Sequence, residues 1–170
     1  MAAAVEFNLN EIDAVKKLLA RASLGAGDRA QLLRAVGAEA EAQTKERFET
    51  KVSPDGNTWK ELAEKTAAYY AENGMTGGSL LVRGGYLRDS VTHNVEGGSW
   101  AVIVGATMEY AATHQFGATI TPKTAKALAV PGYGFLKKVT IPARPYLGVS
   151  ESDARELADL AAGFLARSIK

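Results

Sequence analysis

Two histidines are the side chains of this sequence best suited to acid–base or metal chemistry near neutral pH. His93 alternates with Val91 and Val95, which favours a histidine packed on the apolar face of a strand. His114 follows Tyr110 by four residues, a helical spacing at which packing and hydrogen bonding account for it. Neither histidine has the ligand spacing of a zinc site. We therefore predict no catalytic residue, no metal and no cofactor, and hence no enzyme.

Other catalytic patterns are also missing. The sequence has no cysteine, so it offers no thiol nucleophile and no disulfide. Two glycine pairs lack the following Lys-Ser/Thr of a phosphate-binding loop, and neighbouring acids on helices are expected to be solvated. These glycine pairs are Gly77-Gly78 and Gly84-Gly85, and the acids are Glu39, Glu41, Glu46 and Glu49.

Charge is unevenly distributed along the chain. The 20 basic and 19 acidic residues nearly cancel, which argues against nucleic-acid binding through bulk charge. The stretch 110–150, however, contains no acid. Such a segment is either a solvated loop or a surface facing DNA phosphates or an acidic neighbouring subunit. Its basic residues are Lys123, Lys126, Lys137, Lys138 and Arg144.

The N-terminal sequence lacks the basic start and long apolar run of a signal peptide, and no stretch is apolar enough to cross a membrane. We expect a soluble protein made in a cytoplasm, without a membrane partner.

The first half of the chain predicts helices. One is expected over 11–22 and a longer one over 28–51, capped by Asp28. The sequence SPDG (53–56) predicts a turn, and Thr58 with Glu61 has the spacing of a capping box that would start a third helix ending near residue 72. A loop is expected over 73–79. The buried stripe expected on the long helix is Leu33, Val36, Ala40, Thr44 and Phe48.

The second half predicts antiparallel strands. Segments 90–96 and 99–105 flank Gly97-Gly98, which predicts a hairpin that pairs Val91 with Val104, His93 with Val102 and Val95 with Trp100. Residues 104–117, which we call the corner, predict the end of a strand, a turn and a short helix closed by Gly117.

Short strands are expected over 119–121, 127–130 and 136–141, with a turn at 131–134. An extended segment is expected over 141–148, and Ser150 is expected to cap a final helix that ends near residue 168. The fold class is therefore α+β: antiparallel hairpins packed with a long helix from the N-terminal half and a C-terminal helix. We expect one domain over 1–170, with an N-terminal helical part (1–28), a main part (29–168) and a basic arm at 118–142.

Four blocks in this order resemble the phage virion morphogenesis family, also called tail completion proteins, of Mu-like and P2-like contractile-tailed phages and prophages. Gly84 stands where such sequences usually have Ser or Thr, which removes a helix cap. The resemblance covers about residues 29–168. The blocks are SPDGNTWKEL (53–62), LLVRGGYLRDSV (80–91), VIVGATMEYAATHQFG (102–117) and IPARPYLGVSESD (141–153).

The resemblance implies a structural protein of the virion, made in the bacterial host cytoplasm and acting at the head–tail junction or tail. Its expected partners are copies of itself in a ring, commonly six-fold, and neighbouring neck or tail proteins. It carries no catalytic residues. The roles carried over are a turn and anchor (Asp55, Gly56, Trp59), a corner (Tyr110, His114, Gln115, Phe116, Gly117) and Arg144, which would hold the extended segment.

Alternatives remain open at this point. A DNA-binding accessory factor could use the lysines of the basic arm, with DNA passing along a ring lumen without base readout. A tail-terminator type of assembly factor, or a hydrolase using His114, would fit other features of the same chain.

Overall fold

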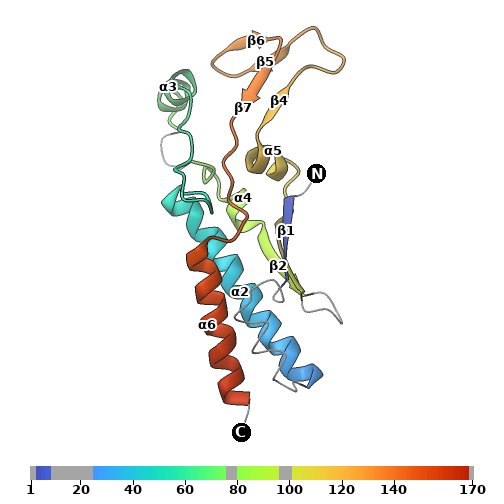
Figure 1. Cartoon of the computed structure of the whole chain (residues 1–170). Coiled ribbons are helices and arrows are strands. Elements are labelled where there is room, and N and C mark those ends of the chain that lie inside the picture. Colours follow the sequence, from blue (N-terminus) through green and yellow to red (C-terminus); the bar gives the residue numbers. More distant parts are fainter. Residues whose placement is uncertain (1–2, 9–24, 76–79, 96–100, 169–170) are drawn as a thin grey trace.

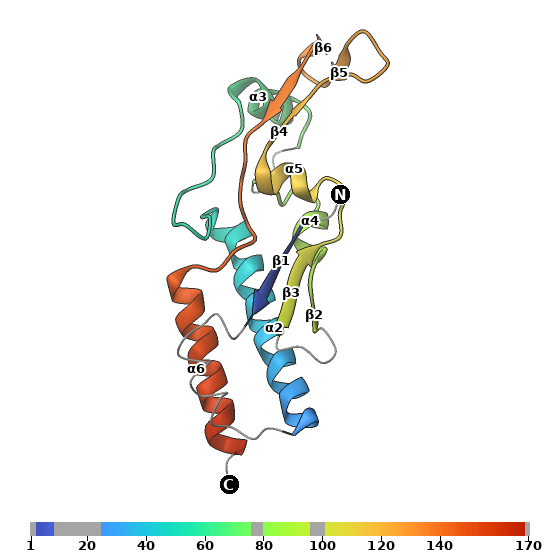
Figure 2. The same ribbon diagram turned by 45° about the vertical axis from the view of Figure 1, so that its right-hand side comes forward.

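The computed structural model describes residues 3–8, 25–75, 80–95 and 101–168. The molecule is elongated (Figures 1 and 2). Helices α2 (Ala26–Thr50) and α6 (Glu151–Ser168) lie side by side and antiparallel, and a sheet covers α2. Helix α3 (Glu64–Glu72) and two small hairpins form the opposite end from the C-terminus. The α+β fold class is confirmed, whereas the helix expected over 11–22 lies outside the described residues.

Helix α2 buries the stripe that the sequence predicts: Leu33, Val36, Ala40, Thr44 and Phe48 are all buried. The predicted N-cap of this helix, Asp28, is wrong. The N-cap is Gly25 without a side-chain hydrogen bond, and Asp28 lies in the first turn. There its carboxylate still favours the positive end of the helix dipole.

The main sheet has three antiparallel strands in the order β1-β3-β2. They are β1 (Ala3–Asn8), β2 (Val91–Val95) and β3 (Ala101–Ala106). The expected β2–β3 pair is confirmed, but its register is shifted by two residues, because Val95 pairs with Val102 and Val91 with Ala106. A shift of two preserves the inward face, so the alternation of side chains could not reveal it. Strand β1 was not predicted.

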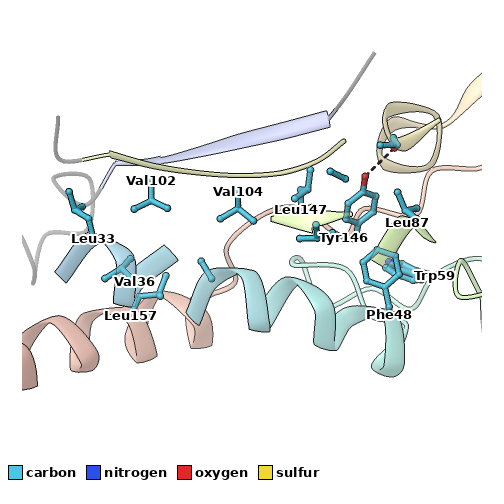
Figure 3. Close-up of a cluster of buried hydrophobic side chains, with 14 of the residues drawn as sticks. Leu33, Val36, Phe48, Trp59, Leu87, Val102, Val104, Tyr146, Leu147 and Leu157 are labelled. Atoms are coloured by element: carbon cyan, nitrogen blue, oxygen red, sulfur yellow. Dashed lines mark hydrogen bonds between the residues drawn. The ribbon is translucent and has the colours of Figure 1, made fainter. Parts of the chain in front are cut away.

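The core lies between α2, α6 and the sheet (Figure 3). Val36, Val102 and Leu157 are buried almost completely there. Gly37 lets the sheet approach α2 closely, since a Cβ at this position would overlap the His93 ring and lie 3.1 Å from Val102 Cγ1. Gly37 therefore serves close packing within the subunit.

Trp59 was expected inside the third helix, but residues 51–63 form a bridge, turns and extended chain. Helix α3 starts only at Glu64, after the N-cap Ala63, and none of its side chains is buried. The capping-box prediction is wrong because Trp59 is instead pulled into the core, where its ring meets Phe48 edge-on at 5.6 Å. Asn73 ends the helix, as predicted.

The basic arm contains two short hairpins. Strand β4 (Ala118–Ile120) pairs with β7 (Val139–Ile141), and β5 (Leu128–Val130) pairs with β6 (Gly134–Leu136). The strand predicted over 136–141 is thus divided into two. The turn predicted at 131–134 is present, and Tyr133 N donates to Val130 O at 2.9 Å.

Two short helices, α4 (Tyr86–Asp89) and α5 (Ala111–Phe116), lie between the sheet and the arm, and α5 is the short helix predicted at the corner. Helix α6 has the predicted cap at Ser150. Ser150 Oγ accepts from Asp153 N at 3.1 Å, and Asp153 Oδ2 accepts from Ser150 N at 2.7 Å. This reciprocal capping box orients α6 as it leaves the extended segment.

Candidate functional site: the corner, the pocket and the basic arm

The side chain of Gln115 clamps the extended segment (141–148) to α5. Its Oε1 accepts from the backbone N–H groups of Tyr146 and Leu147, each at 3.0 Å, and its Nε2 donates to Leu147 O at 3.0 Å. The side chain is buried. The amide thus satisfies backbone groups of a segment that belongs to no sheet, where unpaired groups would be costly.

Tyr146 is the centre of the same corner. Its side chain is fully buried, its ring lies 5.1 Å from that of Phe48, and its hydroxyl donates to Ala111 O at 3.3 Å (Figure 3). Burial raises the pKa of Tyr146 to about 12, so the phenol keeps the proton that it donates. Arg47 Nη1 donates to Tyr146 O at 3.1 Å and the same guanidinium pairs with Asp153. Helices α2, α5 and α6 therefore converge on one residue.

Arg144 fastens the extended segment to the chain that precedes α3. Its Nε donates to Lys60 O at 2.7 Å and its Nη2 to Glu61 O at 3.1 Å. Trp59 Nε1 donates to Pro145 O at 2.8 Å. Burial lowers the pKa of Arg144, which the negative charge of Glu61 partly opposes. The forked guanidinium suits this two-carbonyl contact in a way that a lysine would not.

Three further residues singled out from the sequence lie at exposed positions. Asp55 and Gly56 form an exposed turn, in which Gly56 N donates to Ser53 O at 2.9 Å and Gly56 has φ +83°. Asn57 bonds to the Asp55 carboxylate and lowers its pKa. Phe116 is 70% exposed, so it does not pack into the corner as its neighbours do.

Gly117 ends α5 with φ +71° and ψ 164°. The positive φ agrees with the sequence prediction, but the ψ value places the residue in a region that only glycine enters readily. A Cβ here would also lie 2.8 Å from Ala143 N.

His114 and Tyr110 border a pocket of about 460 Å³ between α3, α4 and α5. Their rings meet edge-on at 5.8 Å. The backbone oxygen of His114 accepts from Arg144 N at 2.7 Å, whereas its buried Nδ1 has no hydrogen-bond partner among the described residues. Burial and the nearby charge of Arg144 lower the pKa of His114 below its usual 6.5, so the ring is neutral at physiological pH.

The four lysines of the basic arm, Lys123, Lys126, Lys137 and Lys138, are exposed. They accompany Phe135, which is 81% exposed on β6. The hairpin carrying them is supported by α3, where Tyr133 and Thr66 hydroxyls lie 3.0 Å apart and Lys65 Nζ stands 5.1 Å from the Tyr133 ring. The arm therefore has a defined attachment, and its charged and aromatic groups face outward.

One polar contact was missed by sequence reasoning. His93 Nδ1 lies 2.7 Å from Glu41 Oε2, and Lys45 bonds to the other oxygen of that carboxylate. Burial raises the pKa of Glu41, but the bonds from Lys45 and His93 outweigh it and lower the pKa below 4.5. The expectation that Glu41 is merely solvated is wrong. The signal that could have found this contact is the three-dimensional approach of β2 to α2, which spacing along the chain does not encode.

Within the described residues no group of three or more His, Cys, Asp or Glu side chains could hold a metal ion. None of the described helices is long and apolar enough to cross a membrane.

Comparison with known sequences gives the class of protein to which this chain belongs. The model of the phage virion morphogenesis family matches residues 10–166. The chain therefore belongs to this family of virion morphogenesis proteins, as the resemblance predicted.

Two individual relatives are similar over much of the chain. "Putative capsid assembly protein G" of Escherichia phage Mu is 29% identical over 121 residues, which cover 69% of this chain and 67% of the relative. "Mu-like prophage FluMu G protein 1" of Haemophilus influenzae is 29% identical over 111 residues, covering 65% of this chain and 61% of the relative. No solved structure matches the chain. The chain thus has a role in phage assembly, and the proteins it resembles come from phage Mu and a Mu-like prophage.

Proposed function

We propose that this protein completes the phage tail or joins it to the head, as a ring of identical subunits, six-fold in the simplest case, at the neck or tail end of the virion. Family membership supports the assembly role. The observation that carries the finer proposal is the basic arm: four exposed lysines and an exposed phenylalanine stand at one end of an elongated subunit, away from its core.

An outward arm on an otherwise stable body suits a subunit that reaches a neighbour. Contacts in which one surface of a subunit binds a different surface of the next copy generate a closed ring when the rotation between neighbouring copies closes on itself. A stable ring contact would bury more than about 1,000 Å² in total. The body of the chain can present such a surface along the exposed face of α2, and the arm can extend the contact to an adjacent ring or tail protein.

The principal test is made in the phage or prophage that encodes this chain. Without the protein, we expect tails that fail to join filled heads, seen by electron microscopy as separate heads and tails. Normal infectious particles in its absence would contradict the proposal. The assembled protein is expected to show a mass of several subunits in solution or in a particle reconstruction.

A matched pair of variants tests the arm. Lys137→Ala with Lys138→Ala removes two arm charges, and Lys60→Ala with Arg167→Ala removes two exposed charges elsewhere. We expect the arm pair to lower the yield of joined particles at least tenfold and the control pair to leave it nearly unchanged. Equal yields of joined particles from the two pairs of variants would show that these arm lysines are not needed for joining.

A second candidate function, DNA contact by the same lysines, follows from the absence of acids in the arm. Binding to duplex DNA would then weaken with salt, with a slope of about −0.9 for each phosphate contacted. A slope near zero would leave an acidic protein as the partner of the arm.

A further inference from the structure

The pocket between α3, α4 and α5 has the composition of a site for an apolar side chain. Its wall includes Leu62, Tyr70, Met75, Leu80 and Leu87, and its volume of about 460 Å³ falls within the range of small-ligand sites. It is a hollow large enough for one bulky side chain and the peptide that carries it. The assembly role of the family does not assign an occupant to it.

Charge around this pocket is one-sided. The residues that line it include Arg83 and Arg144 and no acid. The Arg144 guanidinium already donates hydrogen bonds to the backbone oxygens of Lys60 and Glu61. Arg83 is exposed, stacks over the Tyr70 ring at 4.3 Å and contacts the Met75 sulfur, and no carboxylate of the described residues is within ion-pair distance of it. An apolar pocket with an unmatched guanidinium favours a ligand that carries a negative charge.

The lining of the pocket also contains a buried polar atom without a partner among the described residues. His114 Nδ1 is the buried side-chain atom that lacks a partner within the described part of the chain. Leaving such an atom unpaired costs about 1–3 kcal/mol. The neutral ring can donate from Nδ1 to an incoming carboxylate oxygen. The lining of the pocket therefore includes a histidine with a ring nitrogen that is unpaired within the described chain, and a cation stands at its wall.

The rim of the pocket is aromatic and open. Tyr86 is 70% exposed and Tyr110 is 43% exposed, although large aromatic side chains are usually better covered. Leu81, also in the lining, has φ +63°, an uncommon conformation for leucine. Tyrosines of this kind are enriched where another protein binds.

We propose that this pocket receives an acidic–apolar segment of another virion protein, in which a leucine, phenylalanine or tryptophan fills the hollow and a neighbouring Asp or Glu carboxylate meets Arg83 and His114 Nδ1. The apolar wall would cover the anchor side chain, and the two polar groups would fix its orientation. The basic arm of a second copy is unsuited to this pocket, since its lysines would bring positive charge against Arg83.

The first experiment uses small probes on the intact protein. Hydrocinnamate has an aromatic ring and a carboxylate, and hydrocinnamamide is its uncharged counterpart. We expect NMR titration with hydrocinnamate to shift the ring signals of His114, Tyr110 and Tyr86, with at least threefold weaker binding of the amide. No shift of these signals at millimolar probe, or equal binding of both probes, would overturn the proposal.

Matched arginine variants assign the charge preference. Arg83→Gln removes the unmatched guanidinium from an exposed position, so folding should be retained, and Arg155→Gln removes an exposed arginine on α6. The preference for the carboxylate should disappear in Arg83→Gln and persist in Arg155→Gln. Persistence in both would show that Arg83 does not recognise the charge and would contradict the inference.

The partner itself is tested in assembling particles. A photo-crosslinking amino acid at Tyr86 should capture a peptide of another virion protein that has a large apolar residue within two positions of Asp or Glu. Cross-links solely between copies of this chain, or to a peptide without an acid, would overturn the proposal. The probe titration and the arginine variants use the isolated protein, so they are independent of ring formation and of the arm, and their failure would leave the proposed joining function standing.

Discussion

The two ends of this molecule are built in different ways. The body consists of α2, α6, the three-stranded sheet and the extended segment 141–148, and it contains most of the buried side chains. The distal end consists of α3 and the four strands β4–β7, where no strand side chain is buried and α3 buries none. Core burial stabilises the body, whereas short hairpins and surface contacts shape the distal end.

This difference indicates that the two ends have separate tasks. Marginal hairpins with an exposed Phe135 and exposed lysines gain little from their own subunit. Their conformation would be stabilised further by a partner that binds the folded form. The body, by contrast, can hold its shape alone and so positions the distal end.

Paired phenylalanine substitutions should show the largest contrast. Phe48 is fully buried and Phe135 is 81% exposed. We expect Phe48→Ala to lower the free energy of unfolding by about 3–5 kcal/mol, and Phe135→Ala to change it by less than about 0.5 kcal/mol. Urea unfolding followed by circular dichroism measures both. A large effect of Phe135→Ala would mean that the hairpin belongs to the body.

A glutamine pair tests the clamp. Gln115→Ala leaves two buried N–H groups and one carbonyl without partners, and should cost about 2–4 kcal/mol. Gln31 is exposed on α2, so Gln31→Ala should stay within about 0.5 kcal/mol of the parent protein. Both values come from the same urea titration. Equal small effects would show that the extended segment is held without the clamp.

A pair of glycine substitutions compares the end of α5 with the arm. Gly117→Ala meets both a glycine-only conformation and a nearby backbone nitrogen, and should cost about 2 kcal/mol or more. Gly134, in the arm, has φ +80° and open space around its would-be Cβ, so Gly134→Ala should cost about 1 kcal/mol or less. Thermal unfolding gives the order. A larger loss of stability from Gly134→Ala than from Gly117→Ala would show that the arm depends more on its glycine than the end of α5 does.

The smallest expected effect concerns pH. The folded protein lowers the pKa of His114 below 6.5, so the unfolded chain binds this proton first as pH falls. The neutral ring therefore contributes stability above about pH 6.5 that is lost as pH falls through and below this value. Unfolding measured at about pH 7.5 and pH 5.5 should show a smaller pH-dependent loss in His114→Gln than in the parent protein. The same loss in both would exclude His114 as its source.

Periodicity along the chain was sufficient for much of the body. The stripe of α2 and the Ser150 cap are local patterns, and the structure confirms them. The sheet register could not be obtained, because a two-residue shift leaves the same side chains facing α2. Trp59 illustrates the other limit. Its local sequence favours a helix start, and burial against Phe48 overrides that preference.

The residues of the candidate site were found through family blocks, but their contacts were not. Nothing in the spacing between Gln115 and Tyr146 shows that one side chain would pair with two backbone N–H groups. The contact between His93 and Glu41 likewise requires that β2 lie on α2. The pocket with Arg83 and His114 is visible only after α3, α4 and α5 come together.

Strand β1 has a consequence for the timing of synthesis. Ala3 pairs with Ala106 in β3, so strand β1 leaves the ribosome long before its partner is made. Contacts between residues so far apart in sequence form slowly, since a long loop must close first. The extended segment that fastens the corner is made later still. The body therefore cannot close before the extended segment 141–148 has been made, and a nascent chain without this segment cannot yet offer a finished subunit to a growing particle.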